Sequence, residues 1–121
     1  TLESLVLQVN PARIDLLSID TEGTELEVLL GFDLDKHRPR LILIEDNLYH
    51  LGKHRYLRAK GYRLVKRTML NNWYVPARTR DLQVRVSLAE RLRLWKRVQP
   101  LSAFFRRWRR RQRFKGTVGQ G

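Results

Sequence analysis

Polar side chains follow two short apolar runs of the sequence, residues 14–19 and 41–44. The residues that end or follow these runs are Asp20, Glu22, Glu45, Asp46 and Asn47. Continuous apolar runs of this length are typical of buried strands, and ligands of open α/β sheets bind beyond the carboxyl ends of the strands. If the two strands are neighbours, up to four carboxylates converge on one rim. Such a cluster can serve as a general base, bind Mg²⁺ or Ca²⁺, or orient substrate hydroxyl groups.

Structural roles compete with these chemical ones. Glu22 and Glu25 would stabilise the N-terminus of a helix, and residues 46–47 would begin a turn. We favour the structural role for Glu25 and Glu27. For Asp20 both roles stay open, because an acid that ends an apolar strand has few structural reasons to be there.

Histidine and aromatic residues near the second strand are further candidates. His50 and His54 follow Glu45 at positions that a substrate could reach, although isolated surface histidines are the favoured interpretation. Tyr49, Trp73 and Tyr74 could line an acceptor pocket, but packing in the sheet is favoured for the last two.

The segments that must position these residues alternate between strand and helix patterns. The predicted strands are residues 14–20, 41–45, 62–66 and 73–75. The predicted helices are residues 22–30, ended by Gly31, and residues 53–60, ended by Gly61. Turn-forming residues predict a hairpin loop over 69–72. The expected fold class is therefore α/β, a parallel sheet with helical cover that ends in an antiparallel hairpin.

This predicted sheet is small. Four strands are fewer than the usual five or so of an α/β sheet, and the first residue is Thr1 rather than Met. We therefore expect that the chain lacks an N-terminal half. A small complete domain is the alternative, and it would expose one long apolar edge.

The net charge of +13 is concentrated in the C-terminal third. Residues 1–77 hold 11 basic and 10 acidic side chains, whereas residues 78–121 hold 14 basic and 2 acidic ones. The sequence has no cysteine, which excludes disulfides and thiolate metal sites, and it shows no secretory signal or membrane span. We expect a cytoplasmic protein, with peripheral attachment to a membrane as a further option.

The basic segment has the pattern of amphipathic helices. Pro100 separates two helical segments. Their apolar faces are Leu88, Leu92 and Trp95 in the first segment and Leu101, Phe104, Phe105 and Trp108 in the second. Such a basic, aromatic helix over 88–115 could lie on an anionic membrane or pack its apolar face on the preceding domain. Binding of nucleic acid is less favoured than either.

One stretch of the sequence resembles a known family. The segment IDLLSIDTEGTELEVLLGF, residues 14–32, is similar to the signature of FkbM-type methyltransferases. The similarity continues through 38–47, 61–67 and 71–77, and TLESL at 1–5 resembles the segment that precedes the signature. The resemblance implies residues 1–77 of a Rossmann-like, class I methyltransferase sheet, followed by a basic helical tail at 78–121.

The resemblance also implies chemistry. The family transfers a methyl group from S-adenosylmethionine, here to a hydroxyl group of a sugar, glycan or other metabolite. Asp20 is expected to act as the base or orienting group, with Glu22 as second choice. Substrate contacts would come from Glu45, Asn47 and His50. No metal is assigned.

The cofactor site is the main departure from the family. Its glycine-rich turn and ribose-binding acid would lie upstream of Thr1, because no G-x-G occurs within residues 1–77. This chain then corresponds to the substrate-facing portion of the enzyme and would be inactive alone. The alternative is a non-enzymatic module that binds anionic membrane or nucleic acid through its basic tail.

Overall fold

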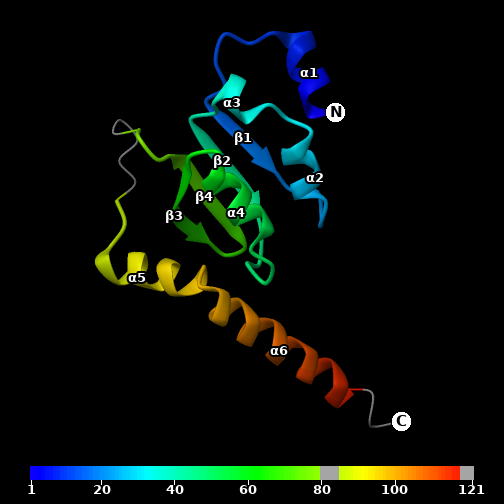
Figure 1. Cartoon of the computed structure of the whole chain (residues 1–121), viewed down its shortest axis with the longest axis vertical. Coiled ribbons are helices and arrows are strands. Elements are labelled where there is room, and N and C mark those ends of the chain that lie inside the picture. Colours follow the sequence, from blue (N-terminus) through cyan, green and yellow to red (C-terminus); the bar gives the residue numbers. More distant parts are fainter. Residues whose placement is uncertain (80–84, 118–121) are drawn as a thin grey trace.

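The computed structural model describes residues 1–79 and 85–117 (Figure 1). Its elements are α1 (Leu2–Val9), β1 (Leu16–Ile19), α2 (Glu25–Leu30), α3 (Leu34–His37), β2 (Leu41–Glu45), α4 (Gly52–Ala59), β3 (Tyr62–Thr68), β4 (Asn71–Pro76), α5 (Leu88–Arg97) and α6 (Pro100–Thr117). No helix in this part of the chain is both long and apolar enough to cross a bilayer. The helices α1 and α6 lie at opposite ends of the long axis of the molecule (Figure 1).

The four strands form one mixed sheet in the order β1-β2-β4-β3. β1 pairs with β2 in parallel, and β4 is antiparallel to both β2 and β3. The α/β class, the parallel pair and the closing hairpin predicted from the sequence are therefore confirmed. The hairpin loop is shorter than predicted, because Thr68 pairs directly with Asn71. Met69 allows this tight turn by adopting a positive φ of 53°.

The main core lies on one face of the sheet. Ile42 and Ile44 of β2 and Tyr74 of β4 are fully buried there, and Leu29 and Leu57 from α2 and α4 pack in the same cluster. The residues of β2 that alternate with these are only half-buried. Helical cover of the sheet was expected, and the structure buries one face of the sheet more completely than the other. Alternation of side chains along each strand explains the difference.

β1 is an edge strand rather than a fully buried one. Leu16 is 54% exposed, and only Ile19 of this strand is buried. The strand predicted over 14–20 is present, but the prediction that it is buried is wrong. On one side β1 has no neighbouring strand among the described residues, so its side chains stay partly exposed. The long apolar run indicated a strand correctly but not its position in the sheet.

Two helices that the sequence analysis did not predict pack at the N-terminal end. In α1, Thr1 and Ser4 form a capping box. The Glu3 carboxylate accepts hydrogen bonds from the Asp33 backbone N–H at 3.0 Å and contacts His37 Nε2 at 2.9 Å. These contacts join α1 to the short helix α3, whose Leu34 is fully buried.

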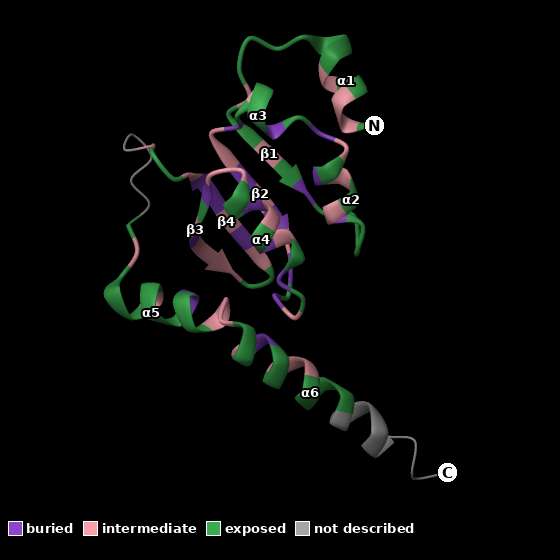
Figure 2. Cartoon of the chain, in the orientation of Figure 1, coloured by how far each residue is buried: buried purple, intermediate pink, exposed green. Residues whose placement is uncertain are grey.

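The two predicted helices of the basic segment are present, and Pro100 begins the second of them. Leu94 of α5 and Ala103 of α6 are buried. The large apolar side chains predicted to form the faces of both helices are exposed (Figure 2). Those of α5, namely Leu88, Leu92 and Trp95, line a groove between this helix and the sheet domain. For α6 the option that the apolar face packs on the sheet domain is wrong, because its four large apolar residues are 50–73% exposed. The division of the chain into domains at residue 77 stays a prediction.

Candidate functional site

The parallel pairing of β1 and β2 brings two carboxyl groups together. Ile19 is in register with Ile44, so Asp20 and Glu45 follow side by side at the strand ends. A hydrogen bond to the Asp20 side chain and the charge of that carboxylate raise the pKa of Glu45 above its ordinary value. The convergence of acids at one rim, predicted on the condition that the strands are neighbours, is confirmed. Asp20 is exposed and Glu45 is half-buried.

A tight turn between β1 and α2 shapes one side of this rim. Glu22 and Gly23 have positive φ values of 50° and 118°, so α2 begins at Glu25, three residues later than predicted. Glu22 therefore lies in the turn and not in the first turn of the helix. At Gly23 a side chain would be strained, because L residues rarely adopt this φ.

The Glu25 carboxylate accepts hydrogen bonds from the backbone of the turn that precedes α2. Its Oε1 accepts hydrogen bonds from the backbone N–H groups of Thr21 at 3.2 Å and Gly23 at 2.8 Å, and its Oε2 accepts one from Lys53 Nζ at 2.8 Å. Burial alone would raise the pKa of Glu25, but these hydrogen bonds outweigh it and lower the pKa to about 2. The structural role favoured for Glu25 is confirmed, although its ionic partner was not foreseen.

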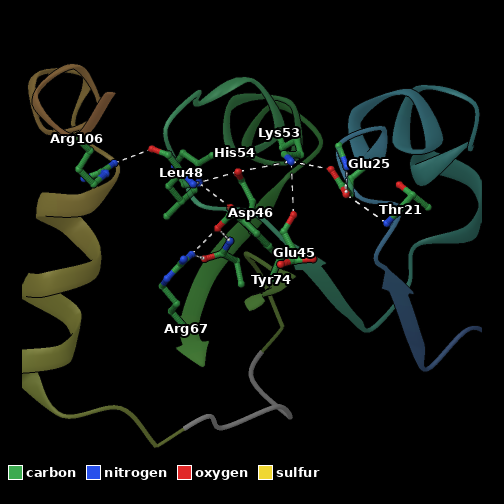
Figure 3. Close-up of polar contacts among 12 residues, drawn as sticks. Thr21, Glu25, Glu45, Asp46, Leu48, Lys53, His54, Arg67, Tyr74 and Arg106 are labelled. Atoms are coloured by element: carbon green, nitrogen blue, oxygen red, sulfur yellow. Dashed lines mark hydrogen bonds and ion pairs between the residues drawn. The ribbon is translucent and has the colours of Figure 1, made fainter. Parts of the chain in front are cut away.

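Lys53 connects three elements around the rim (Figure 3). Besides Glu25, its ammonium group lies 3.5 Å from Asp46 Oδ1 and donates to the Glu45 backbone carbonyl at 3.5 Å. Burial alone would lower the pKa of Lys53, but the bond to Glu25 and the charge of Asp46 raise it. Lys53 thus stays protonated and fixes α4 to the ends of α2 and β2.

The loop after β2 is held by a second set of polar contacts (Figure 3). Asp46 Oδ1 accepts a hydrogen bond from the Leu48 N–H at 3.0 Å, which is the turn predicted for residues 46–47. The Asp46 carbonyl accepts hydrogen bonds from Arg67 Nη1 at 2.6 Å and Asn72 Nδ2 at 2.8 Å. The hairpin β3–β4 therefore positions the loop that carries the predicted substrate contacts.

A cavity of about 630 Å³ lies beside this rim and this loop. Four of the five predicted site residues line it, namely Glu22, Glu45, Asn47 and His50. Asp20, the fifth, is not part of the lining but lies next to Glu45 at the end of the neighbouring strand. The structure thus brings the predicted residues together around one cavity, while their chemical roles stay predictions. Tyr49, also named from the sequence, lines the cavity as well.

α6 contributes to the cavity, which no sequence pattern indicated. Arg110 lines the cavity, and its guanidinium group lies 5.4 Å from the centre of the Tyr49 ring. Arg107 Nη1 lies 3.4 Å from His50 Nδ1 on the same loop. The rim therefore carries cations from α4 and α6 opposite its carboxylates.

A larger groove of about 740 Å³ runs between α5 and the sheet. Apolar and basic residues line it, with no carboxylate among them, so it offers no acidic cluster for the predicted chemistry. His54 is the one histidine that borders this groove. In the described part of the chain, no group of three or more His, Asp or Glu side chains is placed to hold a metal ion.

His54 is not the surface histidine that the sequence analysis favoured. It lies on the buried side of α4, with Nδ1 3.1 Å from the Tyr74 hydroxyl. Burial, followed by the charges of Arg58 and Arg55, lowers the pKa of His54 to about 4. The side chain is therefore a neutral core residue near neutral pH. Tyr74 is fully buried, as its predicted packing role requires.

The residues missed by sequence reasoning are Lys53 and Arg110. Lys53 pairs with Glu25 across 27 intervening residues, and Arg110 lies 61 residues beyond Tyr49. Neither separation corresponds to a motif, so only the packing of α4 and α6 reveals them. A lysine at the start of a helix near two strand-end acids was the one signal available for Lys53.

The fold and the carboxylate rim define an α/β protein with an acidic site at the carboxyl ends of its parallel strands. Residues 1–64, just over half of the chain, match the Methyltransferase FkbM domain. The chain belongs to the FkbM methyltransferase family. No curated protein and no solved structure matches it.

Proposed function

We propose that this domain forms part of an enzyme that transfers a methyl group from S-adenosylmethionine to a hydroxyl group of a sugar, glycan or other metabolite. The single observation that carries the proposal is the carboxyl pair of Asp20 and Glu45 beside a cavity, in a chain of a methyltransferase family. The sheet, which ends in an antiparallel hairpin, supports the Rossmann-like class that the family resemblance implies.

The carboxyl pair suits the proton transfer that O-methylation requires. The acceptor oxygen would form a bond to the methyl carbon as the methyl–sulfur bond breaks and S-adenosylhomocysteine leaves as a neutral thioether. The acceptor would lose its proton, which a carboxylate within hydrogen-bond distance can accept. Asp20 and Glu45 lie side by side at the strand ends, and the Asp20 carboxylate raises the pKa of Glu45, which favours the uptake of a proton by this pair. We assign the role of base to this pair, led by Asp20, and a supporting electrostatic role to Glu22.

The charge of the rim fits the proposed methyl donor. When bound, S-adenosylmethionine supplies an electrophilic methyl group on a sulfonium cation. Asp20 and Glu22 are exposed acids beside the strand end, and a cation near them would gain favourable Coulomb energy. The described residues suggest no individual contacts to the nucleoside, so we assign none.

The cavity supplies groups that can orient an acceptor. The Asn47 amide can donate and accept hydrogen bonds, and His50 offers a ring nitrogen at the same edge. Tyr49 adds an aromatic ring on which a sugar could pack. Holding the acceptor oxygen in line with the transferred methyl is the main contribution expected of these residues.

The test is methyl transfer in the intact protein with isotopically labelled S-adenosylmethionine and a panel of hydroxyl-bearing acceptors. Asp20→Asn should reduce the rate by ~10²–10⁴-fold, because it removes the proposed proton acceptor. Asp35→Asn is the matched control, since Asp35 is an exposed acid that pairs with Lys60 away from the cavity. Equal rates for the Asp20→Asn variant and the parent protein would contradict the assigned base.

The pH profile gives a second test of the pair. The raised pKa of Glu45 means that the rate should fall as the pH drops through a value above the ordinary 4.5 of a glutamate. Glu45→Gln should remove this acid limb or move it to lower pH. A profile unchanged by the substitution would contradict a shared proton.

A further inference from the structure

α6 is held on the sheet domain by polar contacts of its arginines and by a small apolar cluster of Ala103 with Leu48 and Leu51. Arg106 Nη2 donates hydrogen bonds to the backbone carbonyls of Leu48 at 2.7 Å and Arg97 at 2.6 Å. Arg107 and Arg110 contact the same loop through His50 and Tyr49. The arginines at positions 106, 107 and 110 therefore occupy the side of the helix that faces the domain, together with the buried Ala103.

The opposite side of α6 carries large apolar residues. Successive residues of a helix are rotated by about 100°, so positions 101, 104, 105 and 108 gather on one side, roughly opposite Ala103 and Arg107. These residues, Leu101, Phe104, Phe105 and Trp108, are 50–73% exposed. The usual arrangement, in which the large apolar residues of a helix face the domain, is reversed here.

Charge indicates what covers this apolar side. Arg109 and Arg111 are exposed and lie on either flank of the apolar residues. The whole segment 78–121 has 14 basic and 2 acidic side chains, so a second copy of the chain would bring like charge to the contact. A nucleic acid would engage the arginines but would leave apolar side chains such as Leu101 in water. An anionic lipid surface can bind both the arginines and the apolar side chains. Its headgroups pair with the arginines, and the apolar side chains insert at the boundary of the acyl chains.

We propose that the apolar side of α6, formed by Leu101, Phe104, Phe105 and Trp108, docks on an anionic phospholipid membrane. Arg109 and Arg111 contact lipid phosphates at its flanks, while Arg106, Arg107 and Arg110 keep the helix on the sheet domain. Docking in this way sets the loop at Tyr49 and His50, which borders the acidic cavity, near the membrane surface. A membrane-bound acceptor could then reach that cavity.

The test is sedimentation of the protein with vesicles of phosphatidylcholine containing 30% phosphatidylserine, compared with pure phosphatidylcholine. Phe104→Ser/Trp108→Ser should reduce binding to the anionic vesicles at least tenfold. Leu5→Ser/Leu7→Ser is the matched control, because it removes two exposed apolar side chains from α1 at the other end of the molecule. This control variant should bind like the parent protein. All four substituted side chains are exposed, and unfolding curves that match the parent would show that the fold is kept.

The salt dependence of binding distinguishes docking on a membrane from binding to a polyanion such as a nucleic acid. At 0.5 M NaCl the parent protein should keep a substantial part of its binding to anionic vesicles, because the inserted aromatic side chains are not screened. Arg109→Gln/Arg111→Gln should weaken binding to anionic vesicles and leave binding to neutral vesicles unchanged. Equal vesicle binding by the Phe104→Ser/Trp108→Ser variant would overturn the proposal. Complete release by salt, or a dimer that this variant converts to a monomer, would also overturn it. The assay needs no methyl donor, so its outcome is independent of the proposed enzymatic function.

Discussion

The sheet domain, residues 1–79, and the helical segment, residues 85–117, use apolar and charged side chains in opposite ways. In the sheet domain, apolar residues such as Ile44 and Leu57 are buried, and charged residues pair at the rim. In the helical segment, arginines such as Arg106 donate hydrogen bonds to the domain beside a small apolar cluster around Ala103, and most large apolar residues are exposed. An amphipathic sequence therefore predicts a helix, but it does not predict which side of the helix faces the rest of the protein.

The largest effect is expected at the buried ion pair that supports the rim. Glu25→Gln should cost about 4 kcal/mol of unfolding free energy, because Lys53 would keep a largely buried charge with one partner lost. The double variant Glu25→Gln/Lys53→Met should be less destabilised than the sum of its single variants, since removing both charges leaves neither unpaired. Chemical denaturation measures this cycle, and strictly additive losses would contradict the coupling.

The difference in burial between the sheet domain and the helical segment can also be tested by truncating one leucine in each. Leu34→Ala should cost about 3 kcal/mol, because the side chain is fully buried and its removal leaves a cavity. Leu101→Ala is the matched substitution in α6, and it should change the unfolding free energy by less than about 0.5 kcal/mol, because Leu101 is exposed. A loss at Leu101 as large as that at Leu34 would show that the apolar side of α6 is covered.

His54 should make the stability of the sheet domain depend on pH. Its pKa is about 4 in the folded protein and about 6.5 in an unfolded chain, so protonation favours unfolding. The stabilisation is complete above pH 6.5 and falls by about 3 kcal/mol as the pH drops from 6.5 to 4. His54→Asn keeps a polar group near Tyr74 but cannot titrate, so it should flatten this part of the profile. Thermal unfolding at stepped pH values measures it, and an equally steep loss in the variant would assign the effect to another group.

The smallest effect is expected where α6 meets the domain. Arg106→Gln should cost about 1.5 kcal/mol, because it removes charged hydrogen bonds to two backbone carbonyls. The loss should appear as faster hydrogen exchange in α6 with little change in the sheet. Arg109→Gln, on an exposed arginine of the same helix, is the control and should leave exchange unchanged. Faster exchange across the sheet as well would show that the two regions unfold together.

Parts of the site could be predicted because they depend on local pattern and on strand direction. Two apolar runs that end in acids indicated parallel strands, and parallel strands present their carboxyl ends at one rim. The convergence of Asp20 with Glu45 followed from that rule. The start of α2 could not be predicted, because acidic residues suit both a helical first turn and the positive-φ turn that Glu22 and Gly23 adopt.

The α/β class, the parallel pair, the closing hairpin and the helical nature of the basic segment follow from periodicity along the chain. Four features instead depend on how the elements pack, namely the edge position of β1, the burial of His54, the pairing of Lys53 with Glu25 and the arginine contacts of α6 with the domain. Each of these depends on contacts between residues far apart in the sequence. Hydrophobic periodicity indicates that a helix or strand has an apolar side. Which side is buried depends on the elements that pack against it.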